Sequence, residues 1–308
     1  MKRQRRLLAL FVLVAVTGCS SVKLGYNRLD WLVSWQVNRF VDLDRQQKEV
    51  VAERLRVAWD WHRGTQLTLY ARDLRELAAR AERPLDAAEV ERWLAVSQEH
   101  ASRTLREVVP DIARVLGTFS DAQVRELLRN MAERRAERAG ESAELTAAEL
   151  RERAGKQMLK NLKRWMGPAT REQRQRVEQW SNERLYAGTV WQQYEEAWAA
   201  AFSDVLLHRD APDFGQRLAV LFDDARVPYA EDMERLQQHN RKAWVGLMAD
   251  LSASLADKQR RHLRDRLDDL AADLEALAAQ ARRAPAPAAA GGTSGYPASS
   301  FSGESSWR

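Results

Sequence analysis

The chain has 308 residues, of which 45% are hydrophobic and 30% are charged, so it is long enough to bury a sizeable core. The formal charge is +5, but four basic residues lie in the first eighteen positions, and removing them leaves +1. A nearly neutral chain lacks the positive field of a nucleic-acid binder, so we expect no nucleic-acid partner.

The first nineteen residues have the layout of an export signal. Four basic residues precede an apolar run over 7–16, and small residues then lead into Cys19, the only cysteine. The run is about half the ~20 apolar residues that a membrane-spanning helix needs. The pattern therefore predicts a signal peptide over 1–18 rather than a transmembrane anchor. An ordinary secretory signal with a chance cysteine is the less favoured alternative.

The residues around Cys19 resemble the lipobox of bacterial lipoproteins. The resemblance implies that Cys19 becomes the first residue of the mature chain and carries a diacylglycerol and an N-linked acyl chain. It also implies that Ser20, in place of Asp, directs the protein to the outer membrane, facing the periplasm. Each buried CH₂ contributes ~0.8 kcal/mol, so several chains hold a protein at a bilayer almost permanently. Attachment of the lipid would leave no free thiol for a disulfide, a metal ligand or a nucleophile. No cofactor besides this covalent lipid is expected.

The first half of the chain after the acylated tether (19–28) has helical periodicity, and no stretch alternates like a strand. A first helix is expected near 29–40 and a long one from Asp44 to about 83. His62 falls on the apolar stripe of this long helix, which predicts a hydrogen-bonded core residue. Asp86 and Glu89 form a capping-box pattern for the next helix. Pro110 and Gly117 interrupt the helical pattern in the region that follows.

The second half continues in the same way. Helices are expected from 120 and 146, over 170–207, around 212–223 and 229–251, and over 256–283. The sequence thus predicts an all-α domain over 29–283, built as an elongated bundle of long antiparallel helices. Gly167-Pro168 is a candidate boundary between two subdomains, although one continuous bundle fits equally well. The Ala, Pro, Gly and Ser residues of 284–308 predict a disordered tail.

Four of the expected helix starts share a five-residue layout that ends in glutamine, at 43–47, 119–123, 169–173 and 255–259. The layout resembles the Leu-Thr-x-x-Gln signature of periplasmic chaperones and sensors of the Spy and CpxP type, which cradle unfolded clients or restrain a sensor kinase. Helix capping explains the same positions, because an N-cap oxygen and a glutamine three residues later can each accept the other's backbone N–H. We favour capping, although Ala256 lacks the capping oxygen.

A block that follows Cys19 carries a closer resemblance. It consists of Gly25-Tyr26-Asn27-Arg28-Leu29-Asp30-Trp31-Leu32, then Val41-Asp42-Leu43 and Gln46-Gln47. This block resembles a family of proteobacterial lipoproteins known as domain of unknown function 6279. The resemblance implies an all-helical envelope lipoprotein and supplies no catalytic residues.

No catalytic or metal-binding pattern stands out in the sequence. The five histidines are scattered, none is paired at the i,i+3 or i,i+4 spacing of a helical metal site, and neither a nucleophile elbow nor a phosphate loop is present. We therefore expect a non-enzymatic, membrane-anchored module, protein-binding, chaperone-like or scaffolding, whose partner is another envelope protein or an unfolded client. The alternatives are a lipid- or glycan-handling protein with a cavity between its helices, and a spacer between membrane and wall.

Tryptophan is abundant, with 11 in the chain. Large aromatic residues at helical spacing usually belong to a core, but they also dominate binding surfaces. The candidate partner contacts are Trp31, Trp35, Trp59 and Trp61, with core burial as the alternative for each.

Overall fold

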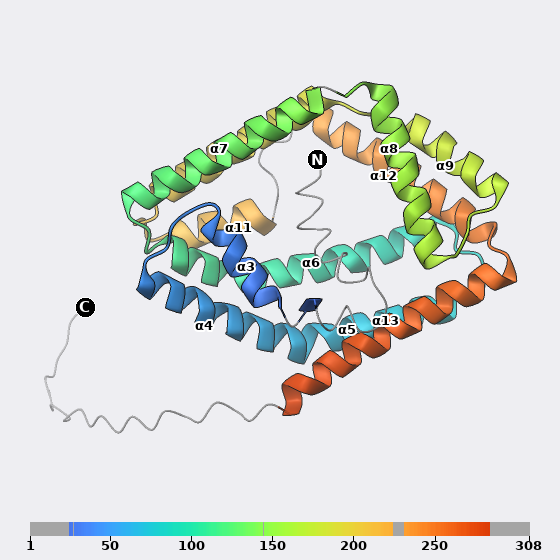
Figure 1. Cartoon of the computed structure of the whole chain (residues 1–308), viewed down its shortest axis with the longest axis horizontal. Helices are drawn as coiled ribbons and strands as arrows, with labels where there is room; N and C mark the ends of the chain where they lie inside the picture. The colour runs from blue at the N-terminus through green and yellow to red at the C-terminus, as the bar shows by residue number, and fades with distance from the viewer. Residues whose placement is uncertain (1–24, 27, 144, 224–230, 284–308) are drawn as a thin grey trace, which may run out of the picture.

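The computed structural model describes residues 25–26, 28–143, 145–223 and 231–283 (Figure 1). Within these ranges the secondary structure is helical and contains no strand, which confirms the all-α class. The signal peptide (1–18), Cys19 and the tail (284–308) lie outside the described residues. The helices are α3 (Leu29–Asn38), α4 (Arg45–Trp61), α5 (Leu67–Arg80), α6 (Ala87–Leu116), α7 (Asp121–Ala143), α8 (Ala147–Trp165), α9 (Arg171–Glu183), α10 (Gly188–Leu207), α11 (Phe214–Asp223), α12 (Glu231–Ala253) and α13 (Asp257–Arg283).

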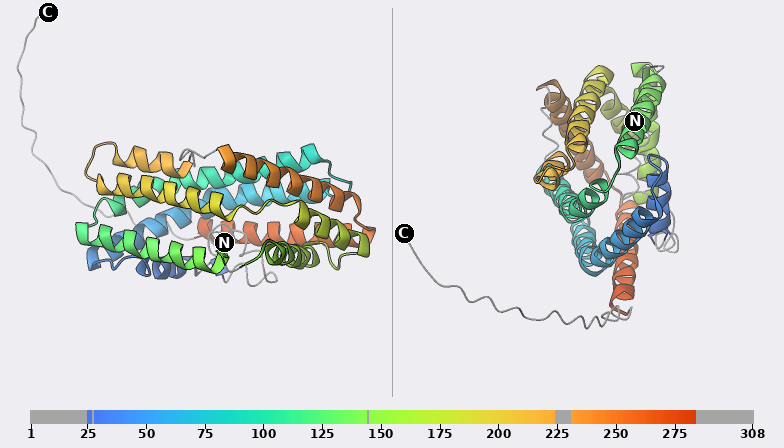
Figure 2. Two further views of the ribbon diagram at one scale, coloured as in Figure 1. Left: turned by 90° about the horizontal axis from the view of Figure 1, so that it is seen from above. Right: turned by 90° about the vertical axis from the view of Figure 1, so that its left-hand side faces the viewer.

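The helices are arranged as an elongated antiparallel bundle, as the sequence predicted. In Figure 1, α7 and α10 lie along one long side, α4, α5 and α13 along the other, and α8, α9 and α12 at one end. α6 runs lengthwise between the two sides and packs against α4, α11 and α12. Figure 2 shows most of the long helices running along the long axis of the molecule, while α8 crosses it at one end. No helix in the described ranges is both long and apolar enough to span a bilayer.

Several helix starts are fixed by local capping. Asp86 accepts from the Glu89 N–H at 2.8 Å, and the Glu89 carboxylate accepts from the Asp86 N–H at 3.1 Å. Reciprocal bonds of the same kind start α4, α8 and α9 at Asp44, Thr146 and Thr170. Each pair satisfies backbone N–H groups that a helix start leaves without a partner. Between α8 and α9, Gly167 has a φ of +84°, a left-handed conformation that glycine adopts at little cost.

The expected helix over 170–207 is wrong, because α9 ends at Glu183 and α10 begins at Gly188. Two side chains of α12 hold the break. The Asn240 amide accepts from the Leu185 N–H at 3.0 Å and donates to the Leu185 carbonyl at 3.0 Å. His239 bonds to the Glu183 carbonyl at 2.8 Å. These tertiary bonds replace helical ones, so the chain can leave the helix without exposing unpaired backbone groups.

Pro110 does not interrupt its helix, since α6 continues through it to Leu116. Proline removes one helical hydrogen bond and normally bends or breaks a helix. Here the neighbours Val109 and Ala113 are both buried in a large apolar cluster, and their packing keeps the segment helical.

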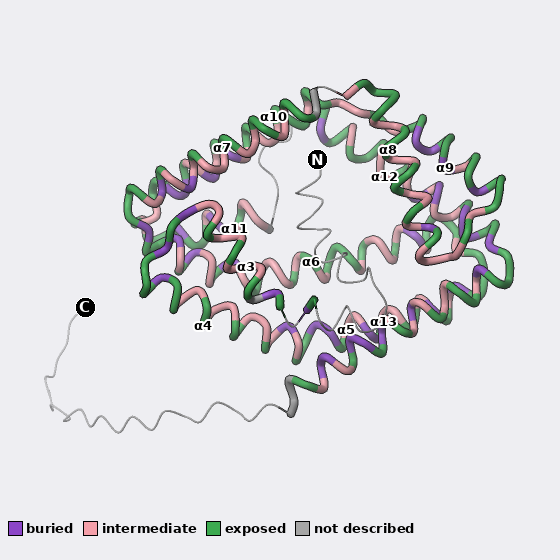
Figure 3. The backbone as a smooth tube through the Cα atoms, viewed as in Figure 1, coloured by how far each residue is buried: buried purple, intermediate pink, exposed green. Residues whose placement is uncertain are grey.

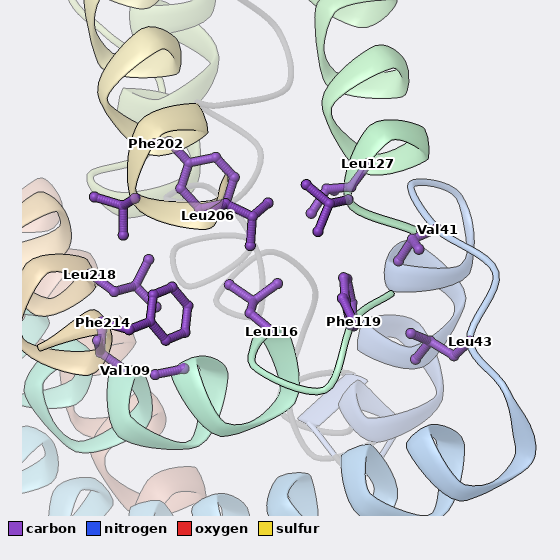
Figure 4. Close-up of a cluster of buried hydrophobic side chains, with 13 residues drawn as sticks. Val41, Leu43, Val109, Leu116, Phe119, Leu127, Phe202, Leu206, Phe214 and Leu218 are labelled. Atoms are coloured by element: carbon purple, nitrogen blue, oxygen red, sulfur yellow. The ribbon is translucent and has the colours of Figure 1, made fainter. Parts of the chain in front are cut away.

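Among the described residues, buried side chains form three apolar clusters, and most helices have a buried and an exposed face (Figure 3). The first cluster, shown in Figure 4, joins the α3–α4 and α6–α7 corners to α10 and α11 through residues such as Leu43, Phe119 and Leu206. The second joins Tyr26 and Leu29 to α5 and α13. The third joins α8, α9 and α12 around Trp180 and Leu247.

Candidate functional site

Two of the four candidate tryptophans are accessible, and they form one surface on α3. Trp31 is 65% exposed and Trp35 is 45% exposed. They are four residues apart, so they share a helix face, and their rings stack with centroids 6.4 Å apart. The guanidinium of Arg39 lies over the Trp35 ring at 4.8 Å. We call Trp31 and Trp35 the α3 aromatic surface.

The opposite face of α3 holds the helix in place. Leu29 and Leu32 pack in the second cluster, and Val37 packs against the first. At the end of the helix, the carbonyl of Phe40 accepts from Asn130 of α7 at 2.7 Å. The carbonyl of Arg39 accepts from Arg134 of α7 at 3.2 Å. The helix is therefore fixed with its two tryptophans directed away from the cores.

Trp59 and Trp61 lie elsewhere, so the four tryptophans do not form one contact surface. Trp59 is half-buried, packs against the second cluster and meets the Tyr26 ring edge-to-face at 5.8 Å. Trp61 is half-buried next to His62, with ring centroids 6.2 Å apart. Trp59 belongs to an aromatic cluster that also contains Tyr26, His62 and Tyr70. We call this cluster the His62 hub.

The His62 hub surrounds a π-helical turn, η1 (His62–Gln66), that joins α4 to α5. π-helical turns are rare within α-helices and are frequently found at functional sites. His62 is 3% exposed, and its Nδ1 lies 2.7 Å from the Tyr26 hydroxyl, which confirms the expected hydrogen-bonded core histidine. The bond ties the segment before α3 to the centre of the long helix.

Both groups of this bond are kept neutral. Burial, and secondarily the positive charge of Arg63, lowers the pKa of His62 from 6.5 to about 4. Burial also raises the pKa of Tyr26 well above its ordinary value, although Arg63 opposes the shift. A neutral phenol–imidazole pair inside a core is suited to holding two segments together.

A second polar pair connects α5 to α6. His100 Nε2 lies 2.7 Å from Asp73 Oδ2, and the Tyr70 hydroxyl lies 3.1 Å from the Thr104 hydroxyl. The rings of Tyr70 and His100 meet edge-to-face at 4.6 Å and cover the histidine. This pair could not be expected from the sequence, because its members are distant along the chain and match no motif. The arrangement resembles part of a catalytic dyad, but the neighbouring hydroxyls of Tyr70 and Thr104 are engaged with each other.

Two hollows on the surface offer little for ligand chemistry. One, of about 560 Å³, is an open depression on α9 lined by Gln175, Glu178, Gln179, Asn182 and Glu183. The other, of about 270 Å³, lies between α7 and α10, with Leu128, Met131, Arg135 and Glu196 among its lining residues. Neither hollow is lined by tryptophan or histidine. Among the residues that the structure describes, no three His, Cys, Asp or Glu side chains gather as a metal site would require.

The glutamines of the recurrent pattern cap their helices and also bond to one another. Gln47 Nε2 donates to Gln123 Oε1 at 3.0 Å, and Gln123 Nε2 donates to Gln47 Oε1 at 2.6 Å. Each amide donates its other hydrogen to a backbone carbonyl near the partner, Gln47 to Thr118 at 3.1 Å and Gln123 to Asp42 at 2.9 Å. We call this reciprocal arrangement a glutamine clasp. The first clasp joins the α3–α4 corner to the α6–α7 corner.

A second clasp repeats the arrangement at the other end of the molecule. Gln173 and Gln259 exchange bonds of 3.1 and 3.0 Å. Gln173 also donates to the Ser254 carbonyl at 3.2 Å, and Gln259 to the Pro168 carbonyl at 2.9 Å. In both clasps the carbonyl lies five residues before the partner glutamine. Reciprocal bonds of Gln47, Gln123 and Gln173 with their N-cap residues confirm the capping interpretation. A client-binding or kinase-restraining role for these glutamines stays a prediction.

A family model described as a family of unknown function (DUF6279) matches residues 39–235, which is more than half of the chain. The chain belongs to the DUF6279 family. No curated protein and no solved structure matches it.

The DUF6279 match agrees with the resemblance in the sequence and locates it along the chain. The matched range contains Val41-Asp42-Leu43 and Gln46-Gln47 but begins after the Gly25–Leu32 block. It includes both glutamines of the first clasp and ends within α12, before Gln259. The α3 aromatic surface lies just ahead of the DUF6279 range, between that range and Cys19.

Proposed function

We propose that this chain is a lipid-anchored protein of the bacterial cell envelope that acts by contact rather than by catalysis. Lipid on Cys19 holds it at a membrane, the outer membrane facing the periplasm, and its helical body is a scaffold or chaperone-like module that binds another envelope protein or an unfolded client. The observation that carries the contact function, with a membrane or with a protein, is the α3 aromatic surface, two accessible tryptophans on a helix close to Cys19 in the sequence. Such residues are left exposed where a protein meets another component.

The construction of the helical body supports a scaffolding role. Two glutamine clasps and three apolar clusters tie distant corners together. Arg75 of α5 adds a two-bond ion pair to Glu275 of α13, at 2.8 and 2.9 Å. A body braced in this way presents a fixed surface, and a partner then binds without a large cost of ordering it.

The alternative is a lipid- or glycan-handling protein with a cavity between its helices. A pocket lined by tryptophan with converging carboxylates and histidine would favour this function. The two hollows described above have neither aromatic nor histidine lining, and the Trp59 and His62 side chains are packed against one another. The geometry therefore favours the contact function.

The proposal is tested in cells in two steps. First, incorporation of labelled palmitate and membrane fractionation are compared for the native chain and Cys19→Ser. We expect label and membrane association only in the native chain, and a Cys19→Ser variant that stays with membranes would contradict the anchor.

Second, a photo-crosslinking amino acid is placed at exposed positions along the body, such as Gln175 on α9 and Arg129 on α7. A discrete protein adduct, identified by mass spectrometry, is expected from at least one position. If no position captures a protein while the chain remains at the membrane, the scaffolding role is wrong.

A further inference from the structure

The α3 aromatic surface is not covered by the rest of the described chain. Leu29, Leu32 and Val37 occupy the inward positions of α3 and fill the two neighbouring clusters. Trp31 and Trp35 belong to none of the three clusters and contact each other and Arg39. Even with the rings stacked, Trp31 stays 65% exposed and Trp35 45% exposed, so covering this surface would remove a large apolar area from water.

The chemistry of the surface fits the headgroup layer of a bilayer. A tryptophan ring has a large apolar body and one N–H donor, and it concentrates where hydrocarbon meets water. Exposed Arg28 precedes the first turn of α3, and Arg39 follows its last residue, so an arginine stands at each end of the helix that carries the tryptophans. Guanidinium groups bind lipid phosphate, often through two parallel hydrogen bonds.

The position of the surface along the chain points to the same partner. Leu29, which starts α3, is ten residues after Cys19. Ten residues span at most about 36 Å when fully extended, so a lipid on Cys19 keeps α3 within that distance of the bilayer. A short tether raises the effective concentration to the millimolar range, and a weak contact is then sufficient.

We propose that the α3 aromatic surface lies in the headgroup layer of the membrane that holds Cys19. This inference rests on the lipid anchor of the proposed function. Asn130 and Arg134 bond to the end of α3, so seating this helix also sets the orientation of α7 and the body. The protein partner is then bound by surfaces that face away from the bilayer.

The test uses the acylated protein in phosphatidylethanolamine–phosphatidylglycerol vesicles with brominated acyl chains, which quench tryptophan fluorescence at short range. Flotation first establishes that the protein is bound to the vesicles. We expect brominated lipid to quench the native chain and expect a Trp31→Phe/Trp35→Phe variant to lose most of that quenching. Phenylalanine keeps the helix face apolar, so the fold should be retained. Trp191→Phe, which replaces an exposed tryptophan on α10, is the matched control and should keep native quenching.

Three results would overturn the inference. Quenching that is the same in the double variant would place Trp31 and Trp35 away from the lipid. A photo-crosslinker at position 31 that captures a protein instead of lipid would make the surface a protein interface. If the native chain carries no lipid, the lipid anchor of the proposed function is wrong. The Cys19→Ser chain is then tested in the same vesicles, and an absence of quenching there would also overturn the placement of α3 in the headgroup layer.

Discussion

Replacing His62 by glutamine should remove a defined pH-dependent part of the stability. Burial lowers the pKa of His62 from 6.5 to about 4. Below pH 6.5 the imidazole is protonated in the unfolded chain and neutral in the folded one, so folding must expel a proton. The unfolding free energy therefore falls as the pH drops from 6.5 to about 4, and His62 contributes no further loss below that value.

The magnitude follows from the two pKa values. At about 1.36 kcal/mol per pKa unit, the interval from 6.5 to about 4 corresponds to about 3 kcal/mol. At neutral pH the His62→Gln variant should be less stable than the native protein, because the packing around Tyr26 is disturbed. That difference should shrink by about 3 kcal/mol on acidification to pH ~4, because only the native protein loses the His62 contribution.

The assay is urea unfolding of the Cys19→Ser chain, followed by circular dichroism at several values between about pH 4 and pH 7. Carboxylates titrate in the same range, but they are common to both proteins and cancel in the difference. Gln237→Ala, at an exposed residue of α12 that does not titrate, is the control, and its difference from the native protein should not change with pH. A difference for His62→Gln that is equally large at both ends of the range would refute a neutral buried imidazole.

Three further substitutions test the capping network. Gln47→Leu removes both bonds between the Gln47 and Gln123 amides and should cost on the order of 1–3 kcal/mol. The double variant with Gln123→Leu should cost less than the sum of the two single variants in the same urea assay, and additive losses would contradict the clasp. Ala256→Ser supplies the oxygen that this N-cap lacks and should add about 0.5–1 kcal/mol, seen as a higher Tm. An unchanged or lower Tm would show that Ala256 is not a cap.

Local signals in the sequence were sufficient for most of the fold. Asp86 with Glu89, and Thr146 with Glu149, reveal helix starts because both partners of each bond lie within four residues. The break between α9 and α10 could not be found in this way, since Asn240 and His239, which hold it, belong to α12. The π-turn at His62 and the clasps are likewise made by contacts between segments distant along the chain.

The candidate site was predictable only in part. The sequence presents two similar pairs of tryptophans, Trp31 with Trp35 and Trp59 with Trp61. It does not show which pair lies on an exposed helix face and which on a buried one. The structure separates them, because Leu29 and Val37 bury the opposite side of α3, while Tyr26 and His62 enclose Trp59. The Asp73–His100 pair had no sequence signature at all.

The second apolar cluster determines when the amino-terminal segment can fold during synthesis. It packs Tyr26 and Leu29, from the amino-terminal end of the described chain, against Leu274, Leu277 and Ala278 near its carboxyl-terminal end. Synthesis delivers the amino end first, so these early side chains wait for their partners until nearly the whole polypeptide is available. Closing so long a loop is slow relative to local helix formation. A truncation that removes the last turns of α13 should therefore leave Tyr26 and Leu29 without their α13 partners, while Asn130 and Arg134 of α7 still hold the other end of α3.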